Sequence, residues 1–109
     1  MNHSINPTDH TLAVTIPGDL LSTNAEQTRT EIFALFESEA VKTTRWETLR
    51  LDLTAAKMVD SVGLNLIVAL YKEAQKRRAK TTVVISNPNI QRTFLFTRLD
   101  KHLTVLMAS

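Results

Sequence analysis

A hydroxyl group at a predicted helix start is the feature of this sequence best suited to chemistry. The four residues Asp60, Ser61, Val62 and Gly63 end a loop that begins at Thr54 and lead into a strongly periodic apolar segment. Either Asp60 or Ser61 could act as the helix N-cap, with Gly63 allowing close packing. Alternatively, Ser61 could accept a phosphate, because free N–H groups and the positive helix end would stabilise a charge of about −1.5 to −2 there. The local pattern leaves both interpretations open.

The rest of the sequence lacks the residue patterns typical of metal sites, cofactor sites and enzyme active sites. Cysteine is absent, and His3, His10 and His102 lack the i, i+3 or i+4 spacing of metal ligands. The two glycines lie in separate loops, which excludes a P-loop or a dinucleotide-binding glycine motif. Neither a G-x-S-x-G motif nor a nucleophile and base pair is visible. We therefore expect no metal, no cofactor and no enzymatic activity.

Charge and length also narrow the range of functions. The formal net charge is only +2, and the basic residues near Arg77 are not interleaved with aromatic residues, so we expect no nucleic-acid binding. The sequence starts without a basic, apolar leader, and its longest apolar run is far shorter than a membrane span of ~20 residues. We expect a cytoplasmic protein without direct membrane insertion. Its 109 residues fit one domain, 1–109.

Alternating strand and helix patterns must position Ser61. Apolar residues recur at period two in the predicted strands and at helical spacing between them. The predicted strands are Thr11–Ile16, Thr48–Leu53, Thr81–Ser86 and Leu103–Leu106, with a short edge strand near Ile5. The predicted helices begin near Thr23, at Ser61 and at Pro88, which follows the N-cap residue Asn87. This order predicts an α/β fold with about three to four helices and a mixed sheet whose later strands are parallel.

The predicted topology places two loops at the same end of the sheet. Loops Gly18–Asn24 and Thr54–Gly63 each follow a strand and lead into a helix, where binding sites of parallel sheets commonly lie. In the helix after Ser61 the expected core stripe is Leu64, Ile67, Val68, Tyr71 and Ala74. A displaced row of Val62, Leu66 and Ala69 should then face outward beside Ser61 and form a protein interface. Phe94 and Phe96 are both expected in the core, with Trp46 at its edge.

The order of these motifs resembles the STAS domain family, particularly bacterial anti-sigma factor antagonists. Leu49–Thr54 and Met58–Leu64 resemble that family's strand and its D-S-[ST]-G-L segment. Thr11–Leu20 resembles its earlier strand and G-[ED]-L loop, and Thr82–Leu106 resembles its closing strand, helix and turn. Together these segments span nearly the whole chain. The resemblance implies a single STAS-like domain.

The same resemblance implies a regulated contact with other proteins. In the family, a partner that is both anti-sigma factor and serine kinase phosphorylates the serine that matches Ser61, and a PP2C-type phosphatase reverses the reaction. The implied function is an anti-sigma factor antagonist that sequesters this kinase while Ser61 is unphosphorylated. The sequence departs from the family pattern at Val62, where a second hydroxyl is common, and at Leu21, where an acid is common. The expected partner-binding residues are Asp19, Leu21, Asp60, Ser61, Val62, Gly63 and Leu66.

A second function remains open at the level of the sequence. STAS proteins also serve as constitutive scaffold subunits of membrane transporter ATPases. In that role Ser61 would only cap its helix and would need no exposure. The two hypotheses differ in whether the Ser61 hydroxyl is accessible to a kinase.

Overall fold

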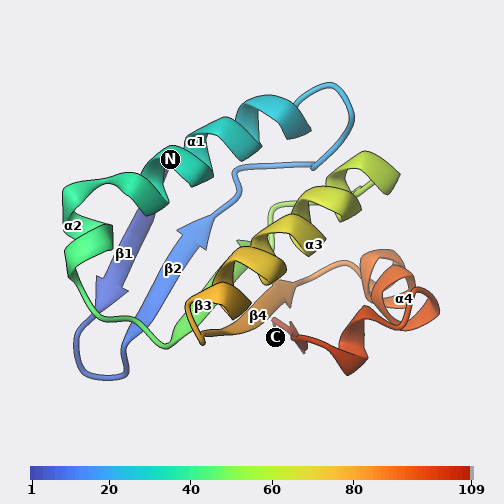
Figure 1. Cartoon of the computed structure of the whole chain (residues 1–109). Helices are drawn as coiled ribbons and strands as arrows, with labels where there is room; N and C mark the ends of the chain where they lie inside the picture. The colour runs from blue at the N-terminus through green and yellow to red at the C-terminus, as the bar shows by residue number, and fades with distance from the viewer. Residues whose placement is uncertain (109) are drawn as a thin grey trace.

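A five-stranded mixed sheet forms the base of the molecule. The computed structural model describes residues 1–108. The strands lie in the order β1-β2-β3-β4-β5, with β1 antiparallel to β2 and the following three pairs parallel (Figure 1). Their bounds are β1 (His3–Asn6), β2 (Thr11–Thr15), β3 (Thr48–Leu53), β4 (Lys80–Ile85) and β5 (Thr104–Met107). The predicted mixed sheet with parallel later strands is confirmed.

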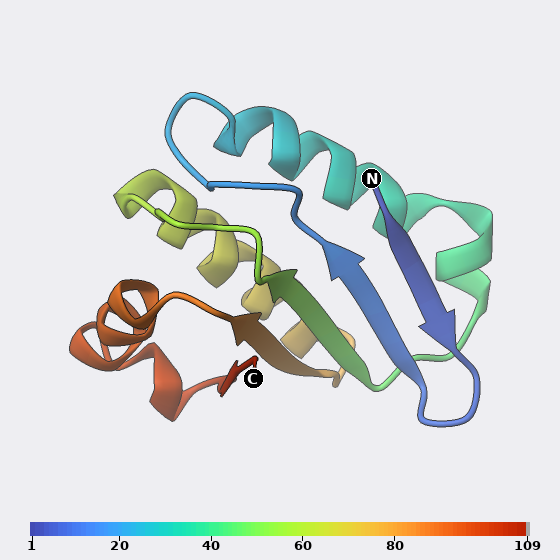
Figure 2. The same ribbon diagram turned by 180° about the vertical axis from the view of Figure 1, so that it is seen from behind.

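Two long helices cover one face of this sheet. The α-helices are α1 (Ala25–Glu37), α2 (Glu39–Thr43), α3 (Ser61–Lys76) and α4 (Pro88–Phe96), and a short 3-10 helix, η1 (Leu99–Lys101), precedes β5. Seen from behind, the strands lie in front of α1 and α3, so both helices are on the same side (Figure 2). The number of α-helices agrees with the prediction. The molecule is therefore a two-layer α/β domain.

Buried and more exposed side chains alternate along the strands, and this alternation shows which face of the sheet the helices cover. Leu12 and Val14 of β2 are fully buried, whereas their neighbours in the strand are only half-buried. The same alternation in β3 buries its leucines and leaves Arg50 exposed. Since side chains point to opposite faces at each step along a strand, the leucines and valines lie under the helices. Burial of this apolar layer stabilises the domain.

The rotation of α3 differs from the predicted one. Its buried residues are Gly63, Leu66, Ile67, Leu70 and Ala74, while Leu64, Val68 and Tyr71 are only half-buried. The first turn of this helix is apolar on several sides, so periodicity does not define a single stripe. A tertiary contact instead sets the rotation, because Gly63 packs directly on the carbonyl of Leu20. The predicted core stripe is therefore right at Ile67 and Ala74, whereas Leu64 and Tyr71 pack against the core only partly buried, and Val68 is half-buried outside it.

The aromatic residues near the C-terminus also differ from expectation. Phe94 is fully buried together with Ile90, but Phe96 is 92% exposed. Two residues of α-helix correspond to a turn of about 200°, so Phe96 points away from the face that holds Ile90 and Phe94. The prediction that Phe96 is in the core is wrong. Trp46 is buried at the core edge as predicted, where its ring stacks on Phe36.

Candidate functional site

Two loops that are distant in sequence are joined at the carboxyl ends of β2 and β3. Leu20 and Val59 form an isolated parallel bridge. The Leu20 N–H donates to the Met58 carbonyl at 3.1 Å, and the Asp60 N–H donates to the Leu20 carbonyl at 3.2 Å. These bonds continue the parallel pairing of the two strands beyond the sheet. The loop before α1 and the loop before α3 therefore form one surface, as the predicted topology requires.

Asp60 is the N-cap of α3 and also holds the other loop. Its Oδ1 accepts from the Gly63 N–H at 2.9 Å, and its Oδ2 accepts from the Ser22 N–H at 2.7 Å. The hydrogen bond from Gly63, followed by that from Ser22, lowers the pKa of Asp60 below its ordinary value, because both bonds favour the ionised carboxylate. Asp60 is therefore a structural clamp between α3 and the residues that precede α1.

Asp19 forms a second clamp in the opposite direction. Its Oδ1 accepts from the backbone N–H groups of Lys57 at 2.7 Å and Met58 at 3.2 Å. Asn24 orders the same loop, since its side chain accepts from the Leu21 N–H and donates to the Asp19 carbonyl. Asp19 and Leu21 are both half-buried. In this structure Asp19 and Leu21 help to fix the conformation of the loop before α1.

Ser61 is exposed at the first position of α3. Because the Asp60 carboxylate caps the helix, the Ser61 hydroxyl is not needed for capping, and within residues 1–108 it makes no hydrogen bond. Val62 beside it is 45% exposed. Helix N-termini present unpaired backbone N–H groups and a positive dipole end. An added negative group on Ser61 would therefore lie in a favourable position.

Gly63 and Leu66 contribute little to the exposed surface around Ser61. Gly63 is buried, and a Cβ built on it would lie 2.1 Å from the Leu20 carbonyl oxygen, so only glycine allows this approach. Leu66 is 4% exposed and belongs to the core. The prediction that Leu66 faces outward is wrong, because the contact at Gly63 rotates α3 so that Leu66 points toward the sheet. Gly63 supports the site through close packing.

The structure adds residues from α1 that the sequence analysis did not identify. A shallow hollow of about 150 Å³ beside Val62 is lined by Ser22, Ala25, Glu26, Arg29, Val62, Asn65 and Leu66. The Arg29 guanidinium lies 5.1 Å from the centre of the Phe33 ring. The i, i+3 spacing of Glu26 and Arg29 places both on one face of α1. That spacing could have indicated this surface once α1 and α3 were known to be neighbours.

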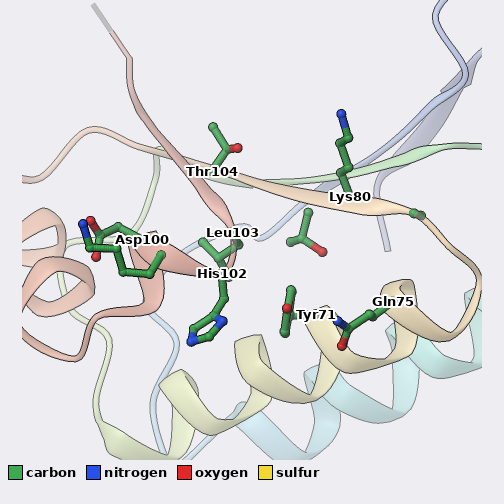
Figure 3. Close-up of a pocket in the computed structure, with 10 residues that line it drawn as sticks. Tyr71, Gln75, Lys80, Asp100, His102, Leu103 and Thr104 are labelled. Atoms are coloured by element: carbon green, nitrogen blue, oxygen red, sulfur yellow. The ribbon is translucent and has the colours of Figure 1, made fainter.

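A second hollow, of about 480 Å³, lies at the opposite end of the sheet. Its walls include Tyr71 and Gln75 of α3 and His102 after η1 (Figure 3). The rings of Tyr71 and His102 are tilted by 52° to one another, with centres 6.2 Å apart. Lys80 and Thr104 on its rim begin β4 and β5, whereas Ser61 follows the carboxyl end of β3. Because these strands are parallel, this hollow is distant from Ser61.

The described residues include neither a metal-binding cluster nor a membrane-spanning helix. Among residues 1–108, no group of three or more His, Asp or Glu side chains is arranged to hold a metal ion. None of the helices in the same residues is long and apolar enough to cross a lipid bilayer.

These observations define a class of small α/β domain whose loop surface presents an exposed serine at a capped helix start. The family model of the STAS domain matches residues 3–108, and the chain therefore belongs to the STAS domain family. The sequence matches none of the curated proteins with which it was compared.

Solved structures of anti-sigma factor antagonists share the fold. The Thermotoga maritima protein tm1081, described as a candidate antagonist, has a TM-score of 0.80 at 19% identity, over 99% of this chain and 86% of its own. An antagonist from Mycobacterium paratuberculosis has a TM-score of 0.74 at 24% identity, over 96% of this chain and 84% of its own. Unphosphorylated SpoIIAA, a Bacillus protein also solved in its phosphorylated form, has a TM-score of 0.64 at 19% identity, over 99% of this chain and 86% of its own.

Proposed function

We propose that the chain is a phosphorylation-switched protein-binding module, an anti-sigma factor antagonist. In its unmodified form it sequesters a partner that is both anti-sigma factor and serine kinase. Phosphorylation of Ser61 releases this partner, and a PP2C-type phosphatase restores the binding form. The chain itself acts in the cytoplasm through protein contacts, without enzymatic activity or a cofactor.

The observation that carries this proposal is the free, exposed hydroxyl of Ser61. A kinase needs a serine that can enter its active site, and Asp60 satisfies the helix cap that would otherwise occupy the hydroxyl. The scaffold hypothesis requires no such exposure. The fold agrees with that of the antagonist structures, one of which is known in a phosphorylated form.

The switch acts through charge and bulk in the contact surface. A phosphate on Ser61 adds about −1.5 to −2 charge beside the exposed Val62, in the middle of the proposed interface. The helix dipole and the N–H groups of the first turn stabilise this charge within the domain. A partner surface that fits the unmodified serine would lose contact with Val62 and would have to accommodate a hydrated dianion.

The test uses the purified anti-sigma kinase from the same organism. With ATP, mass spectrometry should place the phosphate on Ser61, and the phosphoprotein should bind the kinase at least about tenfold more weakly than the unmodified protein. Ser61→Ala should bind without release, and Ser61→Asp should bind weakly. Ser4→Ala, which removes an exposed hydroxyl from β1, is the matched control and should behave like the wild type.

Two results would contradict the proposal. Phosphorylation of another residue would remove Ser61 from the mechanism. Equal binding by the modified and unmodified proteins would indicate a constitutive scaffold in place of a switch.

A further inference from the structure

An exposed aromatic residue on α4 has no role in the fold or in the site around Ser61. Phe96 is 92% exposed, and Met58, in the loop before Ser61, is 58% exposed. Two shallow hollows lie between them, of about 210 and 250 Å³, and both include Thr93 in their lining. They connect the two side chains into one surface. We name it the α4 strip and define it as Lys57, Met58, Asn89, Arg92, Thr93 and Phe96.

The charge of the α4 strip has a single sign. Lys57 and Arg92 are both exposed, and within residues 1–108 neither forms an ion pair. Among the same residues, the Arg92 guanidinium donates only to the Asn89 side chain, at 3.2 Å. Residues 86–99, which contain all of α4, include no aspartate or glutamate. Charge complementarity therefore favours an acidic occupant.

The strip is also held in place before any partner arrives. The backbone N–H groups of Lys57 and Met58 are bound by the Asp19 carboxylate, so this part of the loop is fixed. The start of α4 is fixed by the Asn87 cap followed by Pro88. Exposed phenylalanine and arginine on a rigid surface are suited to anchor a protein partner, because little conformational freedom is lost on binding.

Continuity with Ser61 indicates which partner docks there. Met58 lies three residues before Ser61 in the same loop, and the strip extends from it along α4. We propose that the partner that recognises unphosphorylated Ser61 also docks an acidic segment on the α4 strip. In this arrangement an apolar side chain of the partner packs between Met58 and Phe96, while its carboxylates pair with Lys57 and Arg92. This inference rests on the proposed function.

The test measures the affinity of the purified anti-sigma kinase for variants of the strip. Phe96→Ser and Arg92→Glu should each weaken binding of the unphosphorylated protein by about tenfold or more. Leu106→Ser is the matched control, because Leu106 is 49% exposed on β5, outside the strip. The affinity of this variant for the kinase should stay within about twofold of that of the wild type. The melting temperatures of the strip variants should match that of the wild type, since both side chains are exposed.

The outcomes separate this inference from the proposed function. Wild-type affinity of Phe96→Ser and Arg92→Glu, with Ser61-dependent binding intact, would overturn the strip alone. If the kinase fails to bind even the wild-type protein, the proposed function and the strip are both wrong. Sedimentation that shows a wild-type dimer dispersed by Phe96→Ser would assign the strip to a second copy of the chain. Binding of wild-type protein, but not Phe96→Ser, to phosphatidylserine vesicles would assign it to a membrane surface, and either result overturns the inference.

Discussion

Replacement of Gly63 by alanine tests the packing that supports the Ser61 site. The added Cβ would lie 2.1 Å from the Leu20 carbonyl oxygen, whereas a Cβ essentially never approaches another heavy atom within 3.0 Å. The loop before α1 and the first turn of α3 must therefore separate by roughly 1 Å. That movement also strains the bond from the Asp60 N–H to the same carbonyl. Both effects destabilise the folded state.

The loss of unfolding free energy caused by Gly63→Ala follows from opposing contributions. Overpacking costs about 1 to 3 kcal/mol, and weakening a backbone hydrogen bond costs about 1 kcal/mol more. The better helix propensity of alanine offsets about 1 kcal/mol of this cost. The net loss of unfolding free energy should be about 1 to 3 kcal/mol, which for a chain of this size lowers the melting temperature by about 5 to 20 °C.

Gly18→Ala provides the matched control for this measurement. Nothing lies within 4 Å of a Cβ at Gly18, and neither glycine has a positive φ, so alanine fits there without strain. Its effect should be neutral, or stabilising by up to about 1 kcal/mol. Urea unfolding of both variants gives the comparison, and amide spectra should show shifts at Leu20 and Asp60 only for Gly63→Ala. If the two variants are equally stable, the close approach does not set the rotation of α3.

Three further predictions concern stability, pH and phosphorylation. Leu66→Ala should lower the free energy of unfolding in urea by about 2 to 5 kcal/mol, and Leu66→Glu should prevent folding. If either variant is as stable as the wild type, Leu66 is not a core residue. Because the pKa of Asp60 is lowered in the folded state, its contribution to the free energy of unfolding is complete above about pH 4 and should disappear as the pH falls through the folded pKa. Asp60→Asn should flatten this loss of stability in acid. An unchanged dependence of stability on pH would contradict the role of Asp60 as a clamp. Phosphorylation of Ser61 should change the unfolding free energy by at most about 1 to 2 kcal/mol and confine amide shifts to the start of α3, whereas shifts throughout the helix would require a conformational mechanism.

Features set by nearby residues could be predicted from the sequence. The start of α4 at Pro88 follows from cap chemistry, and the Asn87 side chain accepts from the Asn89 N–H as such a cap requires. The start of α3 follows in the same way from Asp60. Strand alternation and element order were sufficient to predict the parallel pairing, because crossover connections leave few alternatives.

Features set by distant residues could not be predicted in this way. The rotation of α3 depends on Leu20, more than forty residues before Gly63, and the helix sequence itself has apolar residues on several sides. The apolar pattern therefore predicts the wrong face for Leu66. Phe96 is a similar case, because a nine-residue helix with three apolar residues in succession at its end does not show which of them will be buried.

The two aspartate clamps bear on how a phosphate at Ser61 can act. Any opening of the loops would have to break the bonds that Asp60 makes to Ser22 and Gly63 and those that Asp19 makes to Lys57 and Met58, together with the bridge at Leu20. The phosphate repels the Asp60 carboxylate, but the N-terminus of α3 attracts it, so the two effects on the fold oppose each other. The partner has no such compensation, since it meets the new charge directly. A surface that is already held rigid is therefore suited to a switch that changes its charge while its backbone keeps the same shape.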